Sequence, residues 1–145
     1  MNKADLVEQL KRHEGCVLYA YEDHLGYLTI GYGRLIDDRR GGRISEAEAS
    51  LLLFNDIDRV TDAIKNKLPR FHKHPDIVQN ALINMGFQLG VTGLMGFENM
   101  LAAIDRRDYE AAADEALDSL WASPSQTPER AKEIAEMIRS AGDST

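Results

Sequence analysis

The sequence predicts an α+β protein that is mostly α-helical, with a small N-terminal β-hairpin or sheet, a long connecting helix and a helical C-terminal part. Three observations lead to this fold class. Residues 17–35 are rich in Tyr, Gly and Thr and alternate apolar and polar side chains around a turn. The segment after residue 45 carries one apolar face over about 20 residues, and the chain beyond residue 70 follows helical spacing. With 145 residues and a hydrophobic content of 43%, the chain can build one domain with a substantial core.

The N-terminal part is expected to begin with a helix at residues 3–13. Apolar side chains recur there three and four positions apart, and Gly15 follows as a stop signal. Residues 17–35 then form a β-hairpin or small meander, because apolar residues alternate on both sides of the polar turn at residues 23–26. Residues 37–43 contain two adjacent glycines and are expected to form a loop.

The long helix is expected to begin at Ser45, which forms a capping box with Glu48. Pro69 ends it, because proline cannot continue a helix. A helix of about 20 residues spans about 30 Å, which is suitable for a connector between two lobes. Its apolar face comprises Leu53, Ile57, Val60, Ile64 and Leu68.

The helical remainder contains several start and stop signals. We expect helices at residues 77–89 with Gly90 as the stop, at 92–104, at 108–120 with Asp108 as the cap, and from Pro128 onward with Thr127 as the N-cap.

Amide side chains recur at every fourth position of the predicted helix 77–89. Asn80, Asn84 and Gln88 therefore lie on one face of a helix that is otherwise apolar. Such a row forms either a buried, hydrogen-bonded seam or the wall of a cleft, and the pattern alone leaves both open.

Composition narrows the classes of function. The net charge of −7 disfavours nucleic acid as a partner, because binding it normally requires a concentrated basic face. Cys16 is the only cysteine, so no internal disulfide is expected. The N-terminus lacks the apolar core of a secretory signal, and no run of about 18 apolar residues predicts a membrane span. We therefore expect synthesis in a reducing cytoplasm and no stable insertion into a membrane.

Two carboxylates near the N-terminus suggest chemistry. Glu14 ends the first predicted helix, Asp23 lies in the predicted turn, and Thr29 lies on the returning strand. An acid that protonates a leaving oxygen, a base that activates water and a hydroxyl beside that water are what inverting glycoside hydrolysis requires. Taken singly, a solvated glutamate and a turn aspartate are the commoner explanations.

The blocks around these residues make the pattern specific, and they resemble the T4-type phage lysozymes, glycoside hydrolase family 24. The similar segments cover nearly the whole chain in the family's order. They are His13-Glu14-Gly15, Tyr21 to Asp23, Gly26 to Gly33, Ala81 to Gly90, Thr92-Gly93, Gly96-Phe97, Tyr109 to Ala116, Ser119 to Trp121 and Gln126 to Ala131.

The resemblance implies roles for individual residues. Glu14 matches the general acid, Asp23 the carboxylate that activates or orients the water, and Thr29 the threonine beside that water. In an inverting enzyme the two carboxyl groups stand roughly 6.5 to 9.5 Å apart, which leaves room for the water. Leu35 and Phe87 match positions that line the substrate cleft, with Gln88 next to them.

Arg130 matches an arginine that approaches and orients the catalytic glutamate. Such a cation favours the carboxylate form, whereas a general acid must hold its proton. We therefore expect partial burial to keep the pKa of Glu14 raised. Met100 and Glu115 fall where the family's cleft has small or amide side chains, so substrate contacts there are expected to differ.

The resemblance also implies the architecture. It predicts one domain over residues 1–145, with an N-terminal lobe at about 13–60, a C-terminal lobe at about 61–145 and the first helix packed on the C-terminal lobe. The active site would lie in the cleft between the lobes.

The implied function is that of an endolysin or muramidase that hydrolyses the β-1,4 bond between N-acetylmuramic acid and N-acetylglucosamine in peptidoglycan during host cell lysis. No cofactor or metal is implied; His72 and His74 alone are too few ligands for one. The expected partner is a glycan strand, bound by a monomer that leaves the host cytoplasm through a holin. Alternatives are a non-catalytic peptidoglycan-binding domain of the same fold, a phage tail-associated lysozyme domain and a helical protein-interaction domain.

Overall fold

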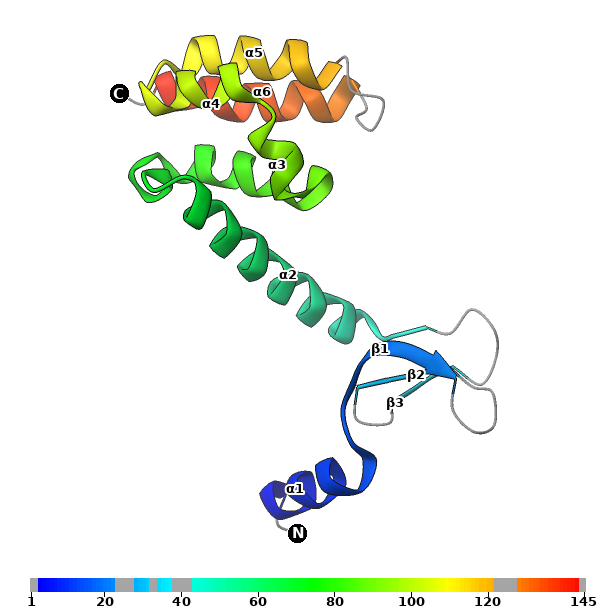
Figure 1. Cartoon of the computed structure of the whole chain (residues 1–145). Coiled ribbons are helices and arrows are strands. Elements are labelled where there is room, and N and C mark those ends of the chain that lie inside the picture. The colour runs from blue at the N-terminus through cyan, green and yellow to red at the C-terminus, as the bar shows by residue number, and fades with distance from the viewer. Residues whose placement is uncertain (1–2, 23–27, 32–33, 38–42, 122–127, 144–145) are drawn as a thin grey trace. The chain divides into compact units, whose positions relative to one another are not determined.

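The chain is mostly α-helical, as predicted (Figure 1). The computed structural model describes residues 3–22, 28–31, 34–37, 43–121 and 128–143. The elements within these ranges are α1 (Lys3–Glu14), β1 (Val17–Glu22), β2 (Leu28–Gly31), β3 (Arg34–Asp37), α2 (Glu46–Lys67), the 3-10 helix η1 (Phe71–Lys73), α3 (Asp76–Met95), α4 (Glu98–Asp105), α5 (Tyr109–Trp121) and α6 (Pro128–Asp143). The chain divides into an N-terminal unit, residues 1–51, and a C-terminal unit, residues 52–145. The predicted lobe boundaries near residue 60 and the packing of α1 stay predictions.

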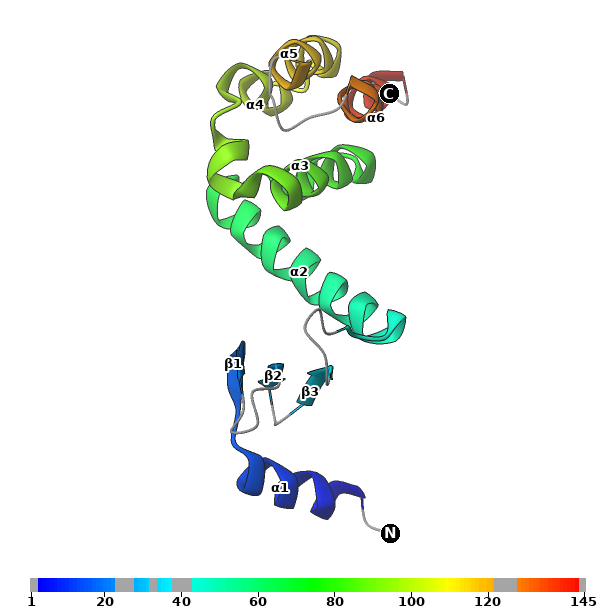
Figure 2. The same cartoon turned by 90° about the vertical axis from the view of Figure 1, so that its right-hand side faces the viewer.

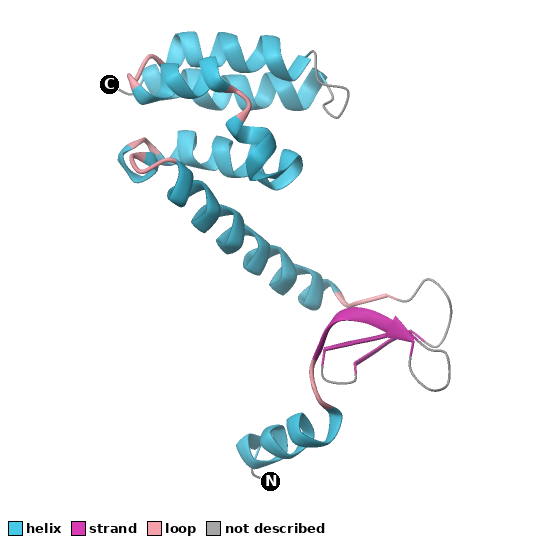
Figure 3. Ribbon diagram, viewed as in Figure 1, coloured by secondary structure: helices cyan, strands magenta, loops and turns pink. Residues whose placement is uncertain are grey.

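The first helix ends where the sequence indicates. Gly15 has a φ of +69°, which costs a residue without Cβ little, and its N–H donates to the carbonyl of Lys11 at 3.1 Å. The strands that follow form an antiparallel sheet in the order β1-β2-β3 (Figure 3). The turn between β1 and β2 lies outside the described residues, so the hairpin stays a prediction.

The capping box at the start of α2 is confirmed. The N–H of Ser45 donates to Oε1 of Glu48 at 2.9 Å, and the N–H of Glu48 donates to Oγ of Ser45 at 3.1 Å. These two bonds satisfy backbone donors that the first turn of a helix leaves open. The helix runs for 22 residues and ends before Pro69, and the boundary between the two units falls within it.

The next two helices differ in part from the prediction. The stop at Gly90 is confirmed as a kink, since its φ of 78° and ψ of 155° interrupt the helical geometry of α3. The continuous helix predicted for residues 92–104 is wrong, because α3 ends at Met95 and α4 begins at Glu98. At this break the N–H of Gly96 donates to the carbonyl of Gly93, three residues back, which tightens the last turn and ends the helix.

The helix pair α5 and α6 lies side by side (Figure 2). Asp108 caps α5 as predicted, since its Oδ1 accepts from the N–H of Ala111 at 3.1 Å. Small side chains let the two helices approach closely, and the structure buries Ala112 and Ala116 on α5 with Ala131 and Ala135 on α6. The residue proposed as the N-cap of α6, Thr127, lies outside the described residues.

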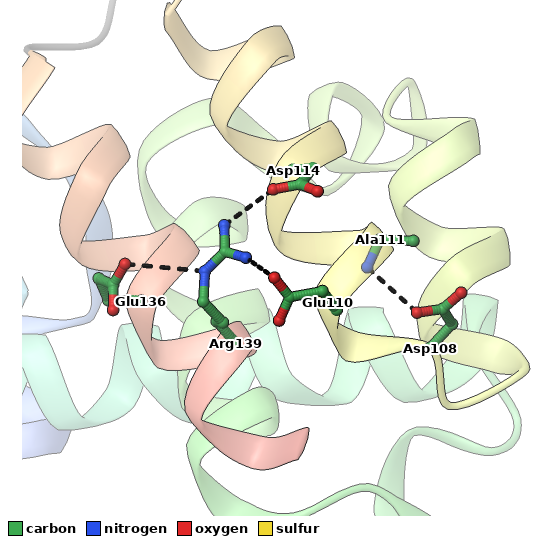
Figure 4. A network of polar contacts seen from close by, with 6 residues as sticks. All are labelled: Asp108, Glu110, Ala111, Asp114, Glu136 and Arg139. Carbon is green, nitrogen blue, oxygen red and sulfur yellow. Dashed lines mark hydrogen bonds and ion pairs between the residues drawn. The ribbon is translucent and has the colours of Figure 1, made fainter. Parts of the chain in front are cut away.

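Arg139 of α6 also joins the two helices through charge (Figure 4). Its guanidinium donates to the carboxylates of Glu110 and Asp114 on α5, the latter at 2.8 Å, and Glu136 lies 3.7 Å from its Nε. The carboxylates of Asp114 and, after it, Glu110 raise the pKa of Arg139, so the side chain stays cationic.

The core described by the structure belongs to the C-terminal unit. Gly86 of α3 lets α2 pack closely, because a Cβ there would lie 3.1 Å from Cγ1 of Val60 and 3.2 Å from Cδ1 of Ile64. The largest fully buried side chains are Phe71, Ile64, Leu82, Met85, Leu94, Met100, Leu120, Ile134, Ile138 and Val78.

Candidate active site

A pocket of about 310 Å³ in the C-terminal unit contains two of the predicted site residues, Phe87 and Arg130. Three helices form it. Its lining residues are Leu53 and Ile57 of α2, Asn80, Ile83, Asn84 and Phe87 of α3, and Arg130 of α6.

The periodicity of α3 explains which residues face this pocket. Asn80, Asn84 and Phe87 lie four and three positions apart and so share one face of the helix. The side chains of Leu82 and Met85, between them in sequence, are fully buried on the core side. The same helix therefore anchors the core and presents a mixed polar and aromatic wall.

Two of the three amide side chains in the row on α3 form part of the pocket wall. Asn80 and Asn84 are exposed and line the pocket, so the buried-seam interpretation is wrong for these two residues. Gln88 is half-buried and is not among the pocket's lining residues.

Arg130 is held against this wall by Asn84. The guanidinium donates from Nε at 3.2 Å and from Nη2 at 2.7 Å to Oδ1 of Asn84. Two donors on one acceptor fix the plane of the guanidinium as well as its position. Asn84 was not among the predicted site residues, although its place in the amide row could have identified it. The predicted contact of Arg130 with Glu14 stays a prediction, because the two residues belong to different units of the chain.

Phe87 gives the pocket an exposed apolar surface. Its side chain is 46% exposed, which is high for a large aromatic residue beside a packed core. Ligand sites commonly combine such a surface with a few fixed polar groups, here the amides and the guanidinium.

Met100 does not contribute to a substrate surface. It is 1% exposed and belongs to the core, so its side chain offers almost no surface to a substrate. Glu115, half-buried on α5, is also absent from the lining of this pocket.

The N-terminal unit carries the residues predicted for catalysis. Glu14 is the last residue of α1. Thr29 on the central strand β2 pairs with Tyr21 of β1 and with Leu35 of β3, so two predicted site residues are direct neighbours across the sheet. Asp23 lies outside the described residues, and the separation of the two carboxyl groups stays a prediction.

The histidines considered as metal ligands have different surroundings. His72 is exposed, whereas His74 is buried and its Nδ1 lies 2.9 Å from the hydroxyl of Tyr109. Burial, and after it the guanidinium of Arg107, lowers the pKa of His74 from its ordinary value of 6.5. Across the described residues there is no cluster of three or more metal-ligating side chains.

No helix in the described ranges is both long enough and apolar enough to cross a bilayer.

Known proteins resemble this chain over most of its length. A probable T4-type lysozyme 1 of Dictyostelium discoideum is 29% identical over 93% of this chain and 94% of its own length. The endolysin of Acyrthosiphon pisum secondary endosymbiont phage 1 is 29% identical over 73% of this chain and 70% of its own. The pre-baseplate central spike protein Gp5 of Enterobacteria phage T4 is 32% identical over 92% of this chain, which matches 27% of that protein.

The family profile described as phage lysozyme matches residues 11–130, a range that extends from α1 into α6 and includes every predicted site residue. The chain therefore belongs to the phage lysozyme family, and it is a lysozyme enzyme of the T4 type.

Proposed function

We propose that this lysozyme hydrolyses the β-1,4 bond between N-acetylmuramic acid and N-acetylglucosamine in peptidoglycan, with inversion at the anomeric carbon. The observation that carries the proposal is the family match over residues 11–130, which includes both carboxylates and the pocket residues of α3 and α6. The proposed fold is the two-lobed α+β lysozyme fold with a small N-terminal hairpin.

In the proposed reaction, Glu14 transfers its proton to the glycosidic oxygen as the bond to the anomeric carbon breaks. Asp23 accepts a proton from a water that attacks the opposite face, and the hydroxyl of Thr29 helps to hold that water. The water oxygen bonds to the anomeric carbon as the glycosidic bond breaks, so no covalent glycosyl-enzyme intermediate forms. One proton is donated and one is accepted in the same step. We expect the carboxyl groups to stand roughly 6.5 to 9.5 Å apart.

The C-terminal pocket is proposed to bind a sugar of the glycan strand. A pyranose has an apolar ring face and polar edges, and an N-acetyl group adds one amide donor, one amide acceptor and a methyl group. Phe87 offers an apolar surface, while the side-chain amides of Asn80 and Asn84 offer donors and acceptors at the same wall. Leu35 and Gln88 are proposed as further substrate contacts.

Arg130 is proposed to orient Glu14. Its link to Asn84 supports this role, because a guanidinium that is already fixed can hold a carboxylate in one geometry at a smaller entropic cost.

The biological role proposed for this activity is host cell lysis by a monomeric endolysin that reaches the cell wall from the host cytoplasm through a holin. The endolysin among the relatives supports it. A tail-associated lysozyme domain is the second candidate, because a spike protein contains a segment similar to 92% of this chain.

The experiment compares clearing of a peptidoglycan suspension by the wild type, Glu14→Gln and Glu8→Gln. Glu8 is an exposed residue of the same helix and serves as the matched control. We expect the wild type and Glu8→Gln to clear the suspension and Glu14→Gln to lose activity by at least about 100-fold, the scale of general acid catalysis. Equal clearing by Glu14→Gln and the wild type would refute the acid role.

A further inference from the structure

A second pocket of the C-terminal unit is larger and shares no lining residue with the pocket of Phe87 and Arg130. Its volume is about 470 Å³. It is surrounded by the end of α2, the segment around η1, the middle of α3 and the end of α4. Its lining residues are Lys67, Leu68, Pro69, Arg70, Phe71, His74, Leu82, Leu101, Ala102, Ile104 and Asp105.

The inner part of this pocket is apolar. Phe71, Leu82 and Ile104 are buried members of the core, and Leu68 and Leu101 are half-buried beside them. A volume of this size with an apolar lining is typical of sites that take small organic molecules.

His74 supplies a polar group within that lining. Its side chain is only 8% exposed and its Nδ1 contacts the hydroxyl of Tyr109 at 2.9 Å. Its other ring nitrogen, Nε2, has no hydrogen-bond partner among the residues that the structure describes. A buried polar atom normally has a partner, and when the Tyr109 hydroxyl donates to Nδ1 the neutral ring carries its proton on Nε2. Because His74 lines the pocket, this ring then brings one N–H donor without an acceptor to the lining.

The charged residues at the pocket favour an anionic group. Arg70 and Asp105 form an ion pair and so largely neutralise each other. Lys67 lies at the same pocket, and within the described ranges no carboxylate pairs with its ammonium group. The lining therefore carries one net positive charge, on a chain whose overall charge is −7.

We propose that this pocket binds a small amphipathic carboxylate, whose apolar body lies against Phe71 and Leu82 and whose carboxylate accepts hydrogen bonds from Nε2 of His74 and from the ammonium of Lys67. This site is separate from the residues proposed for glycoside hydrolysis and does not depend on that proposal.

The test uses hexanoate as the probe and NMR signals of the His74 imidazole as the readout. Hexanamide has the same chain without the charge, and acetate has the charge without the chain. We expect hexanoate to bind saturably, to shift the His74 signals and to raise the pKa of His74, because a carboxylate favours the protonated ring. Hexanamide and acetate should both bind more weakly.

Two lysine variants test where the carboxylate of hexanoate binds. Lys67→Gln removes the proposed partner, whereas Lys65→Gln removes an exposed charge on the same helix turn that does not line the pocket. We expect Lys67→Gln to weaken hexanoate binding by about two- to fivefold, the range of an exposed charge pair, and Lys65→Gln to leave it unchanged. Absence of saturable binding, equal affinity for hexanamide, or equal effects of the two variants would overturn the proposal.

Discussion

Arg130 at the start of α6 donates two hydrogen bonds to the single side-chain oxygen of Asn84 on α3. The two residues are 46 positions apart in sequence, and they meet at a pocket that also contains the exposed ring of Phe87. This contact connects the helix that lines the pocket with the arginine proposed to orient the general acid.

Loss of this contact is expected to slow catalysis more than it weakens substrate binding. In Asn84→Ala the guanidinium loses its fixed plane and the pocket loses one of its two amides, so kcat should fall by a larger factor than KM rises. The free energy of unfolding should fall by no more than about 0.5–1.5 kcal/mol. Steady-state kinetics on peptidoglycan measure kcat and KM, and a urea titration measures the free energy of unfolding. Asn99→Ala, an exposed change on α4 outside the pocket, is the control. A rise in KM alone would show that Asn84 only binds substrate.

The kink of α3 depends on glycine at position 90. With φ at 78° and ψ at 155°, this position lies in a region that is essentially restricted to glycine. Gly90→Ala should reduce the free energy of unfolding by about 1–3 kcal/mol, although a Cβ there would meet nothing within 4 Å. Thermal and urea unfolding measure this change.

Gly142 provides the matched glycine for that experiment. It lies in α6 without a positive φ, and a Cβ there would lie 3.9 Å from the nearest atom. Gly142→Ala should leave stability unchanged or raise it by up to about 1 kcal/mol through helix propensity. Similar effects of the two substitutions would contradict the backbone explanation.

His74 should make stability depend on pH in the acidic range. Its pKa is lower in the folded chain than its value of about 6.5 in an unfolded one, so below that pH the unfolded chain binds more protons. The contribution of His74 is therefore fully present above pH 6.5 and is lost as the pH falls, by at most about 1.4 kcal/mol per pH unit. Burial is the largest cause of the lowered pKa of His74. The nearby guanidinium groups of Arg107 and Arg70 lower this pKa further, whereas the carboxylate of Asp105 raises it.

Urea titrations between pH 4.5 and 8 on the wild type, His74→Asn and His72→Asn test this dependence. The free energy of unfolding should change less steeply with pH in His74→Asn, which has no buried imidazole to protonate. In His72→Asn, which replaces an exposed histidine, this pH dependence should match that of the wild type. An unchanged slope in His74→Asn would assign the acid sensitivity to other groups.

Arg139 should stabilise the α5–α6 pair in a manner that salt weakens. Its guanidinium contacts Glu110 and Asp114 on α5 and lies near Glu136 on its own helix. Arg139→Gln should lower the Tm at low ionic strength, and the difference from the wild type should shrink at 1 M salt, where the Debye length is about 3 Å. Arg59→Gln, which removes an exposed pair with Asp56, should change the Tm less. A Tm difference that salt leaves constant would indicate packing by the arginine stem.

Local signals in the sequence predicted the helix boundaries best. The capping box of Ser45 and Glu48, the cap at Asp108 and the break at Gly90 involve residues close in sequence, and all three are confirmed. The break at Gly96 was missed because the apolar pattern continues through Leu94 and Met100 on both sides of it. Periodicity shows which face of a helix is apolar. It does not reveal a turn after which the apolar side chains continue at helical spacing.

The site was harder to predict than the helices. Phe87 and Arg130 were identified from the family pattern, and the structure brings them to one pocket. The Asn84–Arg130 contact and the burial of Met100 depend on how α3, α4 and α6 pack, which spacing along one helix does not determine.

The configuration of the first product tests the proposed mechanism most directly. A defined peptidoglycan oligosaccharide is cleaved by the wild-type enzyme, and the anomeric proton signals of the new reducing end are followed by NMR before mutarotation equilibrates them. Water activated by Asp23 opposite to Glu14 predicts that the β-linked substrate first yields the α-anomer. The β-anomer as first product would show retention and would contradict this role of Asp23.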